Sequence, residues 1–183
     1  MLLRTERLIL REFVKEDWRA VYAYQNDPRY LEFYEWDHRT ELDVKSFVQM
    51  FLDWQQETPR TRFQLAIVLP STNKLIGNVG IRKREVKAYQ AELGYELDPH
   101  EWGNGYATEA ATAMLQFAFE QLRLHRVWAQ CIANNHNSVR VLEKLGLHQE
   151  GHLRENEFFK SRYWDTLIYG ILEEEWRWKK VSG

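Results

Sequence analysis

The stretch Ala91–Leu122, AELGYELDPHEWGNGYATEAATAMLQFAFEQL, predicts a strand, a glycine-bearing loop and a long helix in succession. Leu93, Tyr95 and Leu97 alternate with Gly or Glu, which is the period of a half-buried strand. Asp98-Pro99 then ends the strand, because proline cannot donate to a central ladder. The rest of the chain is expected to be arranged around this unit.

The loop after this strand has the character of an anion site. Its small residues, within Trp102–Thr108, leave backbone bare where a ligand can approach. From Thr108 onward the pattern is helical, with one apolar face formed by Ala111, Met114, Leu115, Ala118 and Leu122. The first N–H groups of a helix lack partners and its dipole adds partial positive charge. A phosphate-bearing cofactor fits such a loop.

The loop alone does not identify a cofactor, because Gly-x-Gly also occurs in plain tight turns. A Rossmann fingerprint requires a third small residue where Thr108 stands. A P-loop requires Gly-Lys-Ser/Thr, which the sequence lacks. Neither nucleotide-binding motif is supported.

The 183-residue composition favours one domain over residues 1–183. The formal net charge is −2, with 25 basic and 27 acidic residues scattered along the chain, so nucleic acid and anionic membranes are not expected partners. The apolar runs are too short to span a membrane, and the N-terminus is too charged for a signal peptide. We expect a cytoplasmic protein that acts on small molecules or peptides.

Cys131 is the only cysteine, which excludes an intrachain disulfide and a cysteine-based metal cluster, and no metal is expected. A role as an acyl carrier is disfavoured relative to core packing, since nothing nearby in the sequence would lower the pKa of its thiol. The eight Trp and nine Tyr are expected mainly in the core and its rim, although some could line an acceptor pocket.

The remaining segments predict a mixed α/β fold. A strand at Arg126–Ala133 follows the long helix, so a right-handed crossover makes it parallel to the strand at Ala91. Arg29–Arg39 has no clean period and is expected to be a loop or irregular helix that holds substrate. The tail over 173–183 is polar apart from two tryptophans. Further strands are predicted at Arg7–Phe13, Phe63–Leu69, Leu75–Lys83, Gln149–Phe159 and Arg162–Leu172, and further helices at Glu16–Gln25, after Thr40 and at Ser138–Leu145.

Four blocks occur in order along the chain: TERLILREF, WGNGYATEA, NHNSVRVLEKLGL and EGHLRENEFFKSRYWDTLIYGIL. Together they resemble the GNAT superfamily of acetyl-CoA-dependent N-acetyltransferases, from Arg4 to about Trp176. Within it, the match is to the branch that acetylates the N-termini of ribosomal proteins. The resemblance implies a twisted, mostly antiparallel sheet flanked by helices. Its parallel strands, at Ala91 and Arg126, would splay apart to admit the pantetheine arm.

The resemblance also implies which residues bind acetyl-CoA. The family pattern Gln/Arg-x-x-Gly-x-Gly/Ala opens here with Trp102, as is usual in this branch, so backbone N–H groups and the dipole are left to neutralise the phosphates. Asn135 would bind the cofactor or merely order its loop, and Lys144 or Arg140 would meet the terminal phosphate or remain solvated. The implied cofactor-binding residues are Tyr95, Leu97, Trp102, Gly103, Asn104, Gly105, Tyr106, Ala107, Thr108, Asn135 and Lys144.

Two catalytic residues follow from the same resemblance. Glu157 matches a glutamate proposed to accept the amine proton, although a charged residue in an edge strand is often just solvated. Ser138 matches a serine that could assist the departing thiolate, although a serine at a helix start is commonly an N-cap. The expected reaction is direct attack of a protein or peptide N-terminal α-amine on the thioester. A small-molecule amine acceptor, a non-catalytic acetyl-CoA-binding module and a homodimer all remain open.

Overall fold

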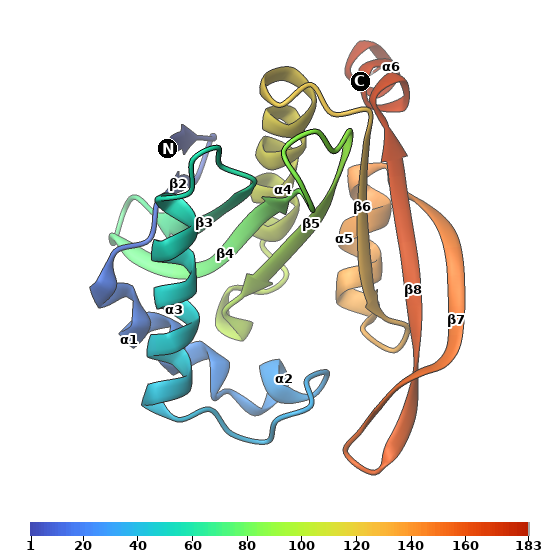
Figure 1. The fold of residues 1–183 in the computed structure, drawn as a ribbon. Coiled ribbons are helices and arrows are strands. Elements are labelled where there is room, and N and C mark those ends of the chain that lie inside the picture. Colours follow the sequence, from blue (N-terminus) through green and yellow to red (C-terminus); the bar gives the residue numbers. More distant parts are fainter. Residues whose placement is uncertain (183) are drawn as a thin grey trace.

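The computed structural model describes the backbone of residues 1–182 and the side chains of residues 1–178. One eight-stranded sheet has the order β1-β2-β3-β4-β5-β6-β8-β7, and helices cover both of its faces (Figure 1). The expected mixed α/β, mostly antiparallel fold is confirmed. The strands are β1 (Leu2–Arg4), β2 (Ile9–Arg11), β3 (Arg62–Leu69), β4 (Lys74–Arg82), β5 (Gln90–Leu97), β6 (Arg126–Ile132), β7 (His148–Phe159) and β8 (Arg162–Leu172).

Four of the helices lie in the segments predicted to be helical. Thr40 caps α3 through a capping box: its hydroxyl accepts from Asp43 N at 3.2 Å, and Asp43 Oδ2 accepts from Thr40 N at 2.8 Å. The helices are α1 (Trp18–Gln25), α2 (Pro28–Leu31), α3 (Glu41–Gln55), α4 (Tyr106–Gln116), α5 (His136–Leu145) and α6 (Glu173–Ser182), with 3₁₀ turns at Lys15–Asp17 and Pro99–Glu101 and a π-helical turn at Phe117–Gln121.

The expected parallel pair is β5 and β6, and the two strands are joined only at their starts. The pairing runs from Gln90 opposite Arg126 to Glu92 opposite Trp128. Beyond Glu92 the strands diverge, as Figure 1 shows, while β5 stays paired with β4 as far as Leu97. The predicted splay is therefore present, and one backbone edge of β5 faces the gap.

Two apolar clusters lie on opposite faces of the sheet. Strand β3 supplies Leu65 and Ile67 to one cluster and Ala66 and Val68 to the other, because successive side chains of a strand point to opposite faces. Helices α4 and α5 cover the first cluster, and α1 and α3 cover the second. The predicted apolar face of α4 is buried except for Leu122, which is partly exposed.

Several local expectations need correction. The strand at the N-terminus is only β2, preceded by the unpredicted β1. The tail forms α6, in which Trp176 is 5% exposed and packs against Phe119. Ser138 is not an N-cap, because Asn135 takes that place and accepts from Ser138 N at 3.1 Å. Cys131 is only partly buried. Among the described residues, no helix combines the length and apolar character needed to cross a membrane.

Candidate active site

A cavity of about 280 Å³ lies where β5 and β6 separate. Its walls come from four places: α2 with the loop after it, the end of β5, the loop before α4 with the first turn of that helix, and one side of α5 with the residue before it. It brings together nearly all of the predicted site residues. Those lining it are Tyr95, Leu97, Trp102, Gly103, Gly105, Tyr106, Ala107, Thr108, Asn135, Ser138, Arg140 and Lys144.

The loop before α4 forms one end of the cavity largely from backbone. Gly103 and Gly105 have φ of +81° and +79°, conformations that side-chain-bearing residues rarely adopt. No heavy atom lies within 4 Å of where a Gly103 Cβ would stand, so the loop is open there. Trp102 Nε1 donates to Leu97 O at 2.9 Å and ties the loop to the end of β5. The arrangement leaves bare backbone at the N-terminus of an eleven-residue helix.

The N-terminal segment braces this loop. Glu109, in the first turn of α4, accepts from Thr5 Oγ1 at 2.6 Å and from Arg7 N at 2.8 Å and Arg7 Nε at 2.7 Å. Arg7 Nη1 also donates to Asn104 O at 2.9 Å. Burial would raise the pKa of Glu109, but these hydrogen bonds outweigh it and lower the pKa. Glu109 thus holds two chain segments together in addition to its expected place in the first helical turn.

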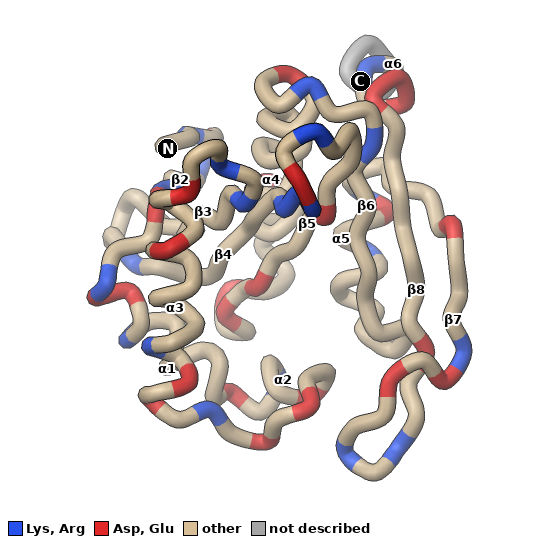
Figure 2. The backbone as a smooth tube through the Cα atoms, viewed as in Figure 1, with Lys and Arg blue, Asp and Glu red and all other residues tan. Residues whose placement is uncertain are grey.

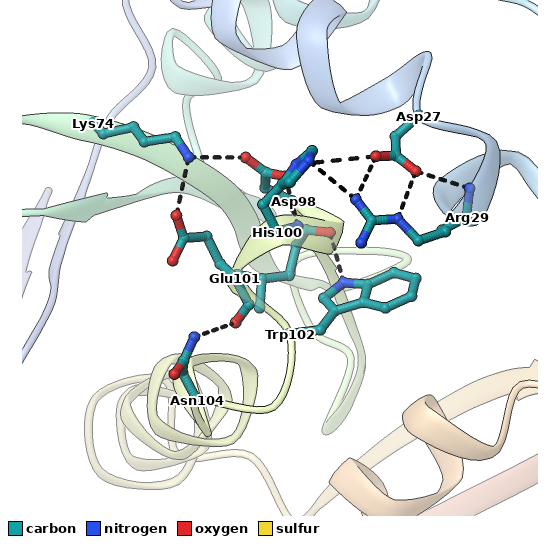
Figure 3. A network of polar contacts seen from close by, with 9 residues as sticks. Asp27, Arg29, Lys74, Asp98, His100, Glu101, Trp102 and Asn104 are labelled. Carbon is teal, nitrogen blue, oxygen red and sulfur yellow. Dashed lines mark hydrogen bonds and ion pairs between the residues drawn. The ribbon is translucent and has the colours of Figure 1, made fainter.

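A polar network joins α2 to the loop before α4 (Figure 3). Asp98 Oδ1 lies 3.0 Å from His100 Nδ1, and His100 Nε2 lies 3.2 Å from Arg29 Nη2. Asp27 binds the Arg29 guanidinium through both oxygens, at 2.9 and 2.6 Å. The hydrogen bonds from the Arg29 side chain lower the pKa of Asp27 to about 2, so it is ionised at neutral pH. The network holds Arg29 at the cavity wall.

Basic side chains therefore reach the cavity from outside the glycine loop. Arg29 comes from α2, and Arg140 and Lys144 come from α5, where residues four apart lie on one face. Arg140 and Lys144, predicted as alternatives for the terminal phosphate, both line the cavity, and Arg29 is a cation there that the sequence did not indicate. The residues present fit a phosphate-bearing group, because bare backbone, a helix N-terminus and three cations share one cavity.

Tyr95 and Ser138 meet at the cavity wall. The Tyr95 hydroxyl donates to Ser138 O at 3.1 Å and lies 2.9 Å from Ser138 Oγ, so the serine hydroxyl can donate to the tyrosine. Burial raises the pKa of Tyr95, so the phenol stays protonated at neutral pH. The two hydroxyls form a neutral, proton-bearing pair.

Glu96 is a site residue that the sequence did not reveal. Its side chain lies on the other face of β5 from those of Tyr95 and Leu97, and the sequence pattern predicts only a half-buried strand there. Its Oε2 accepts from Tyr24 OH at 3.1 Å, Gln25 Nε2 at 3.0 Å and Asn78 Nδ2 at 3.0 Å. Burial raises its pKa, and the hydrogen bonds offset this only in part. Glu96 lines the cavity and is the one acidic side chain among the described residues that do.

Aromatic rings surround the Glu96 end of the cavity. Tyr30, Phe33 and Tyr34, from α2 and the loop after it, all line the wall. Tyr30 stacks on Tyr34 at 4.6 Å between ring centroids and meets Tyr24 edge-on at 5.6 Å. The expectation that Arg29–Arg39 helps to hold substrate agrees with this position.

Two predicted residues lie away from the wall. Glu157 is exposed on β7, opposite Trp164, and accepts from Asn156 Nδ2 at 3.1 Å. Asn104 donates to Glu101 O at 3.2 Å, and its carbonyl is held by Arg7. Neither is among the described residues that line the cavity. Their roles in catalysis and cofactor binding remain predictions.

Comparison with known protein families identifies the family to which the chain belongs. Residues 7–148 match the family model for the acetyltransferase (GNAT) domain. The chain belongs to the GNAT acetyltransferases. It is 34% identical over 176 residues to the uncharacterized N-acetyltransferase YnaD of Bacillus subtilis (strain 168). The aligned residues cover 96% of this chain and 99% of the relative.

Solved structures agree. A GNAT-family acetyltransferase from Bacillus anthracis has a TM-score of 0.82 at 32% identity, covering 95% of this chain and 99% of that one. Two Vibrio cholerae proteins share the fold at 21% identity and 94% coverage of this chain. One is a putative ribosomal-protein-serine acetyltransferase, with a TM-score of 0.78 and 97% of its chain covered. The other is a spermidine N-acetyltransferase in complex with CoA and spermine, with a TM-score of 0.79 and 99% of its chain covered. This protein is an N-acetyltransferase that uses acetyl-CoA and acts on an amine.

Proposed function

We propose that the protein acetylates a primary amine held between Glu96 and the glycine loop, and that a protein or peptide N-terminal α-amine is the first acceptor to test. A small-molecule amine is the alternative acceptor. The observation that carries the proposal is the Glu96 carboxylate, with its raised pKa, in the same cavity as the bare loop. A general base works best when its pKa lies near the working pH, and burial moves a glutamate in that direction.

The cofactor end is assigned to residues 102–108 together with Asn135, Arg140 and Lys144. Acetyl-CoA would supply the acetyl group as a thioester, and coenzyme A would leave as the thiolate. The backbone of the loop and the α4 N-terminus bind its phosphates, and Arg140 and Lys144 add positive charge. The N–H groups at the end of β5, near Tyr95 and Leu97, polarise the carbonyl that is attacked.

Proton transfer is assigned to three side chains. Glu96 takes a proton from the bound ammonium and so produces the neutral amine that attacks. Ser138, hydrogen-bonded to Tyr95, gives a proton to the departing sulfur, and the tyrosine hydroxyl resupplies it. The attacking nitrogen loses its second proton as the amide forms, and that proton returns through solvent to the tyrosine. An α-amine with a pKa of about 7.7–8.0 is partly neutral already, unlike lysine near 10.4, so the demand on the base is mild for an N-terminal acceptor.

An acceptor panel monitored by thiol release tests the proposal. Peptides that differ at residue one, free amino acids and simple amines are each offered with acetyl-CoA, and mass spectrometry checks the product for an added acetyl group. Thiol release that depends on the amine supports an enzyme of this class. Binding of acetyl-CoA with no transfer to any amine would favour a non-catalytic acetyl-CoA-binding module instead.

A further inference from the structure

The Tyr30 hydroxyl is a buried polar group without a hydrogen bond. Tyr30 is 5% exposed, and its oxygen has no hydrogen-bond partner among the described residues. The ring is held between Tyr24 and Tyr34, so the hydroxyl cannot turn away to find solvent. A buried hydroxyl left unpaired costs free energy, and this one belongs to a residue that lines the cavity.

Only one oxygen of the neighbouring Glu96 carboxylate accepts hydrogen bonds from the described residues. All three hydrogen bonds to Glu96 end on Oε2, and none from the described part of the chain reaches Oε1. Tyr30 packs edge-on against Tyr24, whose hydroxyl donates to Glu96, and both Tyr30 and Glu96 line the cavity. A primary ammonium has three N–H donors, and two of them can therefore reach acceptors that the protein leaves open.

We propose that Tyr30 OH and Glu96 Oε1 together bind an acceptor that carries a single positive charge, and that the site selects against polyamines. The proposal rests on the function given above and narrows its acceptor. Among the described lining residues Glu96 is the only acid, whereas Arg29, Arg140 and Lys144 are cationic. Further ammonium groups of a polyamine would find no second carboxylate in the cavity, and burying a charge without a partner costs free energy.

The acidic residues that follow α2 do not line the cavity, so Glu96 is its one acid among the described residues. Glu32, Glu35 and Asp37 follow α2 on the surface, and Asp37 lies 3.5 Å from Lys160. Figure 2 shows residues of both signs around α2 and the β7–β8 hairpin. Exposed carboxylates of this kind contribute little to binding, because water and salt screen them. The aromatic wall of Tyr30, Phe33 and Tyr34 suits an apolar group beside the amine.

The experiment compares n-hexylamine, 1,6-diaminohexane, spermidine and a peptide with an N-terminal alanine and no other charge, at saturating acetyl-CoA. We expect kcat/KM for the singly charged acceptors to exceed that for spermidine by roughly 10-fold or more. Tyr30→Phe should lower kcat/KM for the best acceptor by a similar factor, while the melting shift caused by acetyl-CoA stays unchanged. Tyr89→Phe is the control, since Tyr89 is 65% exposed and outside the cavity wall.

The outcomes distinguish a failure of this inference from a failure of the proposed function. Acetylation of spermidine in preference to the monoamines, or a Tyr30→Phe variant as active as the parent, overturns this inference and leaves the acetyltransferase assignment standing. Absence of transfer to every amine overturns the proposed function and this inference with it.

Discussion

The two ends of the cavity are built in different ways. The end proposed to bind the cofactor is mainly backbone, with two glycines of positive φ and a helix N-terminus within residues 102–108, beside the side chains of Arg140 and Lys144. The end proposed to bind the acceptor is made of side chains: Tyr30 on α2 and Glu96 on β5, with Tyr24 and Asn78 donating to Glu96. A backbone site tolerates changes of side chain and binds one constant cofactor. A side-chain site can change its acceptor through a few substitutions.

The largest effect should come from removing the base. Glu96→Gln keeps the shape but cannot accept a proton, so turnover should fall about 10²–10⁴-fold, toward the lower end with an α-amine acceptor. The measurement is kcat with the best acceptor from pH 6 to 9, alongside the acetyl-CoA melting shift, which should persist.

Glu157→Gln is the matched variant on β7. If Glu157 is the base, that variant should lose turnover instead, and high pH should rescue it because more amine is then neutral. Full activity of Glu96→Gln together with a slow Glu157→Gln would move the base out of the cavity and back to the residue first predicted.

The second effect tests the backbone end. Gly105→Val puts a branched side chain at a φ of +79°, where the pyrophosphate is proposed to bind. At 100 times its dissociation constant, acetyl-CoA should stabilise the parent by roughly 2.7 kcal/mol, and the variant should show almost none of this. Differential scanning fluorimetry with and without ligand measures it.

Gly151→Ala on β7 is the control, because its added Cβ meets its nearest atom at an ordinary 3.5 Å. Circular dichroism must show both variants folded. An unchanged acetyl-CoA shift in folded Gly105→Val would mean that the cofactor binds elsewhere.

The third effect is a difference between Glu96 and Glu109 in how each makes the unfolding free energy depend on pH. Each carboxyl can change that free energy by at most roughly 1.4 kcal/mol per pH unit. The folded pKa of Glu96 is raised above its ordinary 4.5, so its contribution to stability falls as pH rises from 4.5 through the folded pKa. The folded pKa of Glu109 is lowered, so its contribution is present above 4.5 and is lost as pH falls through the folded pKa.

Urea titrations of the parent, Glu96→Gln and Glu109→Gln between pH 3 and 8 check these signs. Glu96→Gln should flatten the slope above pH 4.5, and Glu109→Gln the slope below it. Identical curves for the parent and Glu96→Gln would show that this carboxyl keeps an ordinary pKa.

The smallest effect concerns the network between the two ends. His100→Ala removes a 68% exposed side chain, so the expected cost is under about 1 kcal/mol, seen as a rise of up to roughly fivefold in acceptor KM with kcat unchanged. His148→Ala, also exposed, is the control. A large loss of kcat in His100→Ala would instead make His100 part of the catalytic machinery.

The sequence by itself determined the features that depend on neighbouring residues. Hydrophobic period located most of the strands and helices, though not β1 or α6, and Thr40-x-x-Asp43 marked the start of α3. The glycine loop with its helix was predicted to be an anion site from the same local pattern. These are local signals, because a turn, a cap or a helix N-terminus is formed by residues a few positions apart. The ordered family blocks extended them to the acetyltransferase class.

Only the tertiary structure decided how distant segments meet. Arg7 reaches a loop 97 positions away, and Tyr24 reaches Glu96 across 72. In the sequence Glu96 is one charged residue in an alternating strand, and solvent exposure would satisfy it equally well. Its raised pKa exists because α1 and α2 cover that face of β5, and burial is a property of the packed fold that local sequence pattern does not encode.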